Sequence, residues 1–289
     1  MDLKVYRITG KETISIREYA TRADKKLDKA DIRDRKMPDN IARMAAFQEK
    51  LYAENQHALL IVLQAMDAAG KDGIIRHVMT GLNPQGTRVV SFKVPSSEEK
   101  DHDYLWRIVK ALPPRGEIGI FNRSHYEDVL VARVHDLVRH SQLPPELVTD
   151  KIWDTRYRQI RDFERHLHEN GTTVVKIFLH VSKEEQRQRL LDRINQPDKN
   201  WKFNAGDIQE RRHWDKYMDA YERMMQHTAT ENAPWYVVPA DNKWFARYLV
   251  SEIVLNALET IDPQIPSLSP EDQAQLAECR QLLEEEAST

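Results

Sequence analysis

The sequence predicts a three-layer α/β/α sandwich around a parallel sheet, on the strength of two observations. Five segments rich in apolar residues recur at intervals that leave room for a helix between them. Several are apolar along nearly their whole length, as strands must be when helices cover both of their faces. The expected strands are residues 58–64, 87–93, 117–121, 172–181 and 235–240.

The helices between these strands are predicted from their end signals. In a capping box, a serine side chain accepts a bond from a backbone N–H, and a glutamate three residues later returns one. That spacing occurs at Ser96 and Glu99, Ser124 and Glu127, and Ser182 and Glu185. Further helices are expected over 40–56, 150–169 and 183–193, with Asn170-Gly171 ending the second of these.

The chain of 289 residues is expected to form one large α/β domain over residues 1–260, followed by an acidic tail over 261–289. The net charge is −3, but the tail holds seven acidic residues and one basic residue. The remaining 42 basic and 39 acidic residues give the body a charge of +3. Since bulk attraction for polyanions is then weak, any phosphate-rich partner must bind in a local basic groove.

Composition also argues against several classes of protein. No apolar run reaches the roughly eighteen residues that a membrane span needs, and the first residues lack the apolar centre of a secretory signal. We therefore expect a cytoplasmic protein with no membrane partner. A single Cys279 cannot form an internal disulfide and is expected to be inert. The scattered histidines and the absence of a Gly-x-Ser-x-Gly motif argue against a zinc site and a hydrolase triad.

The stretch ALLIVLQAMDAAGKDGIIR, residues 58–76, is typical of a strand, a phosphate-binding loop and a helix. Gly70 allows close backbone approach to an anion, and Lys71 opens the helix, where free N–H groups and the helix dipole attract a phosphate. Ala65 and Asp72 replace the usual first glycine and the usual Ser/Thr, so the pattern alone is weak. Asp67 is a candidate Mg²⁺ ligand in place of the missing hydroxyl, or simply a turn residue.

Two further segments carry candidate site residues. Asn122 and Arg123 follow the strand 117–121, at the sheet edge where ligands of parallel sheets bind. Glu127 lies one turn later, either as a functional acid or as half of a capping box, and Arg133 is expected to be solvated on spacing alone. Residues 194–206 are expected to form a basic, mobile excursion that closes over a ligand, with an ordinary surface loop as the alternative.

A row of basic residues between positions 189 and 202 leaves two interpretations open. Arg189 and Arg193 share a helix face, with Lys199 and Lys202 beyond, and could follow a chain of phosphates or form a salt-bridged surface. The aromatic residues Trp214, Tyr217 and Tyr221 are expected to pack in the core rather than to stack on a base.

Taken together, four segments resemble the polyphosphate kinase 2 family: MDAAGKDG (66–73), FNRSHYEDVL (121–130), WKFNAGD (201–207) and PWYVVPADNKWFAR (234–247). The resemblance covers roughly residues 30–260. It implies a phosphate-loop kinase fold similar to thymidylate kinase, with a helical lid at about 183–215. It also implies phosphoryl transfer between inorganic polyphosphate and nucleotides with Mg²⁺, for which Mn²⁺ is a possible substitute.

The same resemblance implies residue roles. Asp67 and Lys71 match the Walker A aspartate and lysine, and Asn122, Arg123 and Glu127 fall in the Walker B segment. These five are the predicted catalytic residues, and Asp67 and Glu127 are the predicted metal ligands. The predicted phosphate- and nucleotide-binding residues are Ala69, Gly70, Lys71, Asp72, Gly73, Arg76, Lys93, Arg133, Arg189, Arg193 and Lys202.

The pair Asn122 and Glu127 resembles class III of the family, whose members phosphorylate both AMP and ADP. The main hypothesis is therefore a reversible, polyphosphate-dependent kinase that makes ADP and ATP, with other purine nucleotides as further candidate acceptors. Neither a membrane nor nucleic acid is expected as a partner. The resemblance also suggests a homo-oligomer, either a dimer or a tetramer. Two alternatives remain: an ATP-dependent nucleoside monophosphate kinase, and a non-catalytic module that binds nucleotides or nucleic acid.

Overall fold

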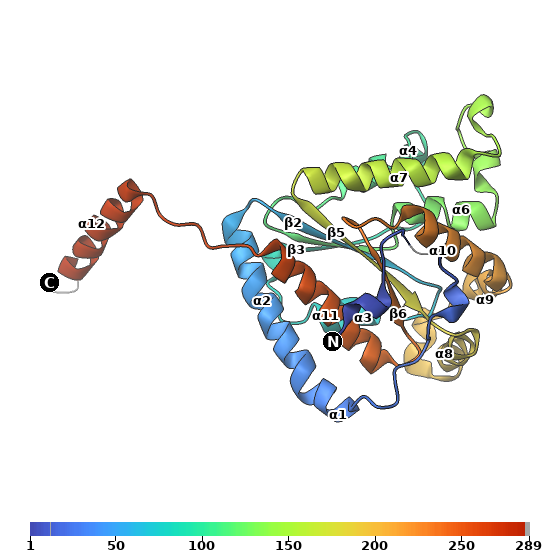
Figure 1. The fold of residues 1–289 in the computed structure, drawn as a ribbon, viewed down its shortest axis with the longest axis horizontal. Helices are drawn as coiled ribbons and strands as arrows, with labels where there is room; N and C mark the ends of the chain where they lie inside the picture. Colours follow the sequence, from blue (N-terminus) through green and yellow to red (C-terminus); the bar gives the residue numbers. More distant parts are fainter. Residues whose placement is uncertain (12, 287–289) are drawn as a thin grey trace.

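A six-stranded sheet forms the centre of the molecule, in the order β1-β6-β5-β2-β4-β3 (Figure 1). The structure is a computed structural model that describes residues 1–11 and 13–286. Its strands are β1 (Arg7–Ile8), β2 (Ala58–Gln64), β3 (Thr87–Ser91), β4 (Ile118–Asn122), β5 (Thr172–His180) and β6 (Trp235–Pro239). All five strands predicted from the sequence are present, and they pair in parallel. β2 is buried along its whole length, as its apolar sequence requires.

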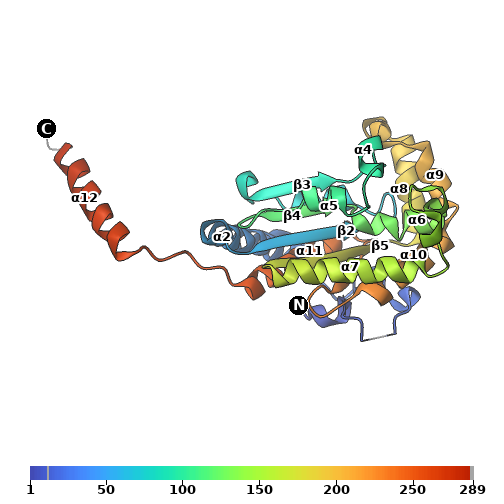
Figure 2. The same cartoon turned by 90° about the horizontal axis from the view of Figure 1, so that it is seen from above.

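Helices cover both faces of this sheet, which confirms the predicted three-layer architecture. On one face α11 packs against α2 and α3, while α7 packs on β5 and against α10 on the other (Figures 1 and 2). The α-helices are α1 (Lys29–Asp31), α2 (Met37–Glu54), α3 (Lys71–Val78), α4 (Ser97–Lys100), α5 (Trp106–Lys110), α6 (Val131–Val134), α7 (Ile152–Glu169), α8 (Lys183–Asn195), α9 (Ala205–Arg211), α10 (Trp214–Thr228), α11 (Lys243–Ile261) and α12 (Pro270–Glu286).

The sequence does not predict three features of the structure. The short strand β1 adds an antiparallel edge to the sheet, and its two residues are too few to give a pattern. The helix expected after Ser96 is interrupted and continues as α5. The acidic tail carries α12, which has no buried residue and projects from the body (Figure 1). Among the described residues, no helix is long and apolar enough to cross a membrane.

The three predicted capping boxes have different outcomes. The box of Ser96 and Glu99 is present with both of its hydrogen bonds. Ser182 caps α8 through the Glu185 N–H, but the Glu185 carboxylate binds Arg189 instead of returning the bond. The box at Ser124 is wrong, because the Ser124 hydroxyl accepts from the Tyr126 N–H and the Glu127 carboxylate binds Arg123. The structural role predicted for Glu127 is therefore absent.

A buried ion pair lies in the core beneath the turn that follows β4. The Lys176 ammonium of β5 donates to Glu164 Oε2 at 2.6 Å, to the Thr228 carbonyl at 2.8 Å and to the Tyr126 hydroxyl at 3.1 Å. The Tyr126 hydroxyl donates to Glu164 Oε1 at 2.6 Å, and both charged side chains are almost fully buried. Because every donor of the ammonium has an acceptor, this charge is tolerated in the core. The network fixes Tyr126, three residues after Arg123.

We expect Lys176→Met to lower the free energy of unfolding by about 3–5 kcal/mol, because it leaves Glu164 as an uncompensated buried charge. Denaturant unfolding at neutral pH measures this difference. The control Lys25→Met changes an exposed lysine and should shift the value by less than about 0.5 kcal/mol. A decrease of less than about 1 kcal/mol in the free energy of unfolding of Lys176→Met would show that the ion pair contributes little to stability.

Candidate active site

The carboxyl ends of the parallel strands open into a cleft of about 780 Å³. Its walls come from the β2–α3 loop, the end of β4, the start of α11 and the segment from α8 to α9. Ten basic residues line it: Lys71, Arg76, Lys93, Arg123, Arg189, Arg193, Lys199, Lys202, Lys243 and Arg247. Four aspartates accompany them: Asp67, Asp72, Asp192 and Asp207. The cleft is thus strongly cationic, although the chain as a whole carries −3.

The β2–α3 loop has the geometry of an anion-binding turn. Gly70 caps α3 with a φ of 116°, a conformation that side chains disfavour and glycine permits. The first backbone bond of the helix runs from Ile74 N–H to the Gly70 carbonyl. The N–H groups of residues 71–73 therefore have no partner within the helix and face the end where the dipole is positive. The predicted loop residues Ala69, Gly70, Lys71, Asp72 and Gly73 all line the cleft.

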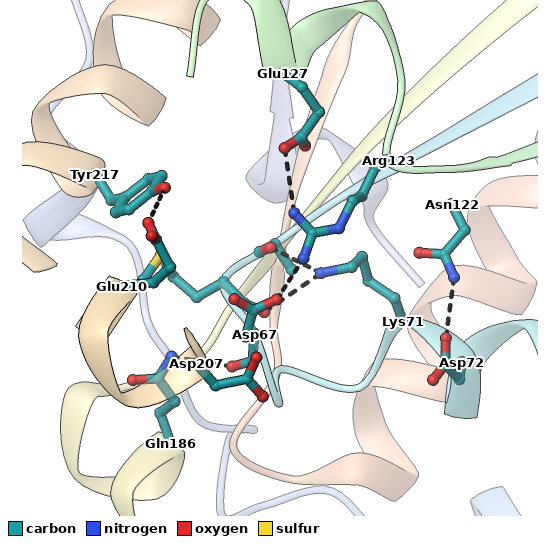
Figure 3. Close-up of polar contacts among 12 residues, drawn as sticks. Asp67, Lys71, Asp72, Asn122, Arg123, Glu127, Gln186, Asp207, Glu210 and Tyr217 are labelled. Carbon is teal, nitrogen blue, oxygen red and sulfur yellow. Dashed lines mark hydrogen bonds and ion pairs between the residues drawn. The ribbon is translucent and has the colours of Figure 1, made fainter. Parts of the chain in front are cut away.

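Arg123 connects the two predicted metal ligands (Figure 3). Its guanidinium donates to Asp67 Oδ1 at 2.5 Å and to Glu127 Oε2 at 3.2 Å. Burial lowers the pKa of this guanidinium, but the Glu127 and Asp67 carboxylates raise it by more, so the group stays charged. The backbone of Arg123 is left-handed, with a φ of 64°, at a strain cost of order 1–3 kcal/mol. The buried network around Tyr126 holds the chain on the far side of this turn.

On the other side of Lys71, Asn122 and Asp72 bind each other (Figure 3). Asn122 Nδ2 donates to Asp72 Oδ1 at 2.9 Å and thereby joins the end of β4 to the first turn of α3. Asp72 stands where a phosphate loop usually has Ser or Thr. An amide at position 122 can donate to this carboxylate, whereas a carboxylate there would repel it.

Lys71 lies between these two pairs and beneath the loop. Its ammonium donates to the Ala65 carbonyl at 2.8 Å and to the Met66 carbonyl at 3.4 Å. Burial of the ammonium, followed by repulsion from Arg123, lowers the pKa of Lys71 to about 8. A phosphate placed in the cleft would restore a preference for the charged form. The ammonium is therefore charged at neutral pH but close to its titration range.

The segment from α8 to α9 supplies the remaining predicted residues. Arg193 donates to Asp207 Oδ2 at 2.8 Å, and Lys202 lies over the exposed Trp201 ring. α9 brings the Asp207 carboxylate to the same cleft as Asp67, and burial followed by the Asp67 charge raises the pKa of Asp207. The residues expected to form a loop at 194–206 instead include a 3₁₀ turn, Pro197–Lys202, and the start of α9.

Two predicted residues lie away from the cleft wall. Glu127 lies behind Arg123 and does not line the cleft. With the Gln64 side-chain amide assigned from its hydrogen-bond partners, the Gln64 nitrogen donates to Glu127 Oε1 at 2.9 Å. Arg133 is partly buried against the Trp153 ring, 5.4 Å from its centroid. The aromatic residues Trp214, Tyr217 and Tyr221 are buried, as the packing interpretation predicts.

Sequence reasoning missed two basic residues that contribute to the cleft. Lys243 and Arg247 lie in the first turns of α11, immediately after β6. Arg247 lines the cleft together with Arg76, and burial followed by repulsion from Arg76 lowers the pKa of Arg247. The signal was available, because both residues follow the carboxyl end of a parallel strand and are spaced four apart.

The carboxylates fit a hard divalent cation better than a soft metal. Among the described residues, no group of three or more His, Cys, Asp or Glu is arranged around a common point. Mg²⁺ needs only one or two protein carboxylates when phosphates and water complete its shell. Asp67 meets this requirement because it lines the cleft, whereas Glu127 is enclosed by Arg123 and Gln64.

This combination of a parallel sheet, a phosphate-binding loop and a basic cleft at the strand ends defines a phosphate-loop kinase. Residues 26–266 match the family model described as polyphosphate kinase 2. An ADP-polyphosphate phosphotransferase of Rhodopseudomonas palustris is 46% identical over 282 residues, which cover 97% of this chain and 98% of the relative. An AMP/ADP-polyphosphate phosphotransferase of Meiothermus ruber is 53% identical over 224 residues, which cover 78% of this chain and 80% of the relative.

The solved structures agree with the sequence comparison. The crystal structure of polyphosphate kinase 2 from Arthrobacter aurescens TC1 superposes with a TM-score of 0.85 at 41% identity, covering 95% of this chain and 96% of that one. The chain belongs to the polyphosphate kinase 2 family and is a kinase of that family. The resemblance inferred from the four sequence segments is confirmed.

We expect kcat/KM for the phosphate donor to fall as the pH rises through about 8, because Lys71 loses its proton and with it its attraction for phosphate. Initial rates between pH 6.5 and 9.5 at constant ionic strength measure this. In a Lys71→Arg variant, which stays charged throughout, this alkaline decline should be absent even if the variant is slower. A wild-type profile that stays flat to pH 9.5 would contradict the assignment.

Proposed function

We propose that the protein transfers phosphoryl groups from inorganic polyphosphate to AMP and ADP, reversibly and with Mg²⁺, forming ADP and ATP. The observation that carries this proposal is the cleft with ten basic and four acidic residues, which extends from the phosphate loop to α8 and α9. A polymer of phosphates has no base or sugar to recognise, so a run of Lys and Arg is the chemistry that binds it. The printed names of the relatives support the same donor and acceptors.

The chain's own groups would bind and orient the reacting phosphates. Phosphoryl transfer needs in-line positioning and stabilisation of spread negative charge more than covalent help. The free N–H groups at the start of α3, together with Lys71, would hold one phosphate at the bend. Arg123 would reach the transferred group from the end of β4, with its other donors on Asp67 and Glu127. Removing one such donor from an enzyme typically costs about 3–4 kcal/mol of transition-state stabilisation.

The metal proposal concerns Asp67 foremost. Bound Mg²⁺, which Mn²⁺ could replace, would supply positive charge that offsets the negative charge of the reacting phosphates. Asp67 would hold it directly, and the Arg123 bond to the same carboxylate would then be shared or released. Glu127 would act through Arg123, orienting the guanidinium, rather than as a direct ligand.

The choice between AMP and ADP rests on the end of β4. The resemblance to class III of the family depends on Asn122 and Glu127. The structure shows Asn122 bound to Asp72 and Glu127 bound to Arg123, so both residues act on the loop through a neighbour. We propose that these two bonds, through Asp72 and Arg123, contribute to the choice between AMP and ADP as the acceptor.

Purified protein with polyphosphate, Mg²⁺ and AMP should yield ADP and then ATP, as measured by chromatography. With ATP as the only donor, phosphorylation of AMP should be slower, which separates this activity from an ordinary nucleoside monophosphate kinase. No product from either acceptor would end the proposal. Salt-sensitive binding of nucleotide or nucleic acid without turnover would favour the non-catalytic alternative.

Lys71→Met should lower kcat by roughly a hundredfold or more in a protein that still folds, because the side chain supplies charge at the transferred phosphate. The melting temperature should fall modestly, since the carbonyls of Ala65 and Met66 lose the donor that Lys71 provides. The matched control is Lys25→Met, an exposed lysine away from the cleft lining. Normal turnover by a folded Lys71→Met protein would remove this lysine from the mechanism.

A further inference from the structure

The phosphate loop can present its N–H groups only if its carbonyl groups point elsewhere and find donors. The carbonyls of Ala65 and Met66 accept from the Lys71 ammonium. The carbonyl of Gly70 accepts from the Ile74 N–H within α3. The three carbonyls between them, at residues 67, 68 and 69, receive their bonds from side chains of a single helix, α8. Among the described residues, these three carbonyls accept no other hydrogen bond.

Arg189 supplies two of these three bonds. Its Nη1 donates to the Ala68 carbonyl at 3.2 Å and to the Ala69 carbonyl at 2.7 Å. Its Nη2 donates to the carbonyls of Ala240 and Asp241, at 2.6 and 3.1 Å, just beyond β6. Its Nε donates to Glu185 at 2.8 Å.

This set uses every donor that the side chain has. A guanidinium carries five N–H groups, and five protein acceptors surround the one on Arg189. The side chain is 6% exposed, so water does not replace these partners. The Nη1 atom also lies 3.8 Å from the point that a Cβ on Gly70 would occupy, directly under the bend. A phosphate in the cleft therefore finds no free donor on Arg189.

Gln186, one turn earlier on α8, completes the set. Its Nε2 donates to the Asp67 carbonyl at 3.0 Å (Figure 3). Its Oε1 accepts from Arg211 of α9 at 2.7 Å. The side chain is fully buried. Gln186 thus connects the loop to the helix that carries Asp207.

The acceptors beyond β6 are themselves fixed. The Asp241 carboxylate accepts from the Ser182 N–H at 2.7 Å, at the start of α8, and from the Thr21 hydroxyl at 3.0 Å. The beginning of α8, the end of β6 and the N-terminal segment therefore form one frame. Arg189 spans from that frame to the loop.

We propose that Arg189, together with Gln186, is a positioning residue that holds the phosphate loop in its anion-binding conformation, in place of the polyphosphate-binding role that the sequence predicts for Arg189. This inference rests on the proposed function for its kinetic readout. Arg193, one turn later on the same helix, differs from Arg189 in its number of acceptors. It lines the cleft, and its guanidinium donates to one carboxylate, that of Asp207, rather than to five acceptors. The first two turns of α8 belong to the support of the loop, and direct phosphate contacts begin beyond them.

The test compares Arg189→Met and Arg189→Lys, with kcat and KM for polyphosphate measured at saturating ADP and Mg²⁺. Lysine keeps the charge but cannot reach four carbonyls in a planar fork, so both variants should lose kcat by roughly tenfold to a hundredfold. KM for polyphosphate should stay within about threefold of the wild type, because no phosphate contact is removed. The matched control is Arg187→Met on the same helix, which should leave both constants unchanged. Arg187 is exposed, and its one side-chain partner within the described part of the chain is Glu184.

The opposite kinetic pattern would overturn the inference. A polyphosphate ligand at position 189 would raise KM by tenfold or more in the methionine variant with kcat retained, and lysine would restore it. Unchanged kinetics in Arg189→Met would overturn it as well. If that variant does not fold, Gln186→Met replaces it in the same assay. We expect a several-fold lower kcat at constant KM, and a raised KM would contradict the proposal.

Hydrogen exchange gives a readout that does not depend on turnover. Amides of residues 74–78 in α3 should exchange faster in Arg189→Lys than in wild type or Arg187→Met, since the loop that precedes the helix loses its support. Equal exchange in all three proteins would contradict the positioning role. Wild-type protein that is inactive with polyphosphate would end the proposed function while leaving this measurement valid.

Discussion

The constraint on which the site depends is the bonding of the loop carbonyls between β2 and α3. A peptide group that turns its N–H toward a ligand turns its C=O the other way, and a buried carbonyl without a donor costs about 1–3 kcal/mol. Lys71, Gln186 and Arg189 supply those donors beneath the bend. Two of the three come from α8, so the loop and the region that overhangs it form one structural unit.

The parallel sheet is the second source of order. The carboxyl ends of β2, β4, β5 and β6 lie at the same edge, so residues far apart in the sequence converge there. Asp67, Arg123 and Arg247 meet at one cleft for this reason. Three residues after the left-handed turn at Arg123, the Tyr126 hydroxyl is bound by the buried ion pair of Lys176 and Glu164, which ties this edge of the sheet to the core.

The basic side chains that attract phosphate to the cleft also repel one another and so lower the stability of the folded protein. Ten basic side chains around one cavity repel one another, and the aspartates and backbone carbonyls offset this cost. Burial of the Lys71 ammonium, followed by repulsion from Arg123, lowers the pKa of Lys71. A polyanion bound in the cleft would relieve the same repulsion, which favours binding over an empty site.

The sequence by itself determined the five parallel strands, the loop and most of the cleft residues, because burial on both faces and turn geometry leave local patterns. Only the tertiary structure decided the hydrogen-bond partners of the side chains at the site. Ser124 and Glu127 have capping-box spacing, yet Glu127 binds Arg123 because the turn after β4 brings that guanidinium within reach. Arg189 has the spacing of a phosphate ligand, yet its five donors point to carbonyls of two distant segments. Spacing along a helix gives the face on which a side chain lies, whereas its hydrogen-bond acceptors are fixed only when separate segments pack together.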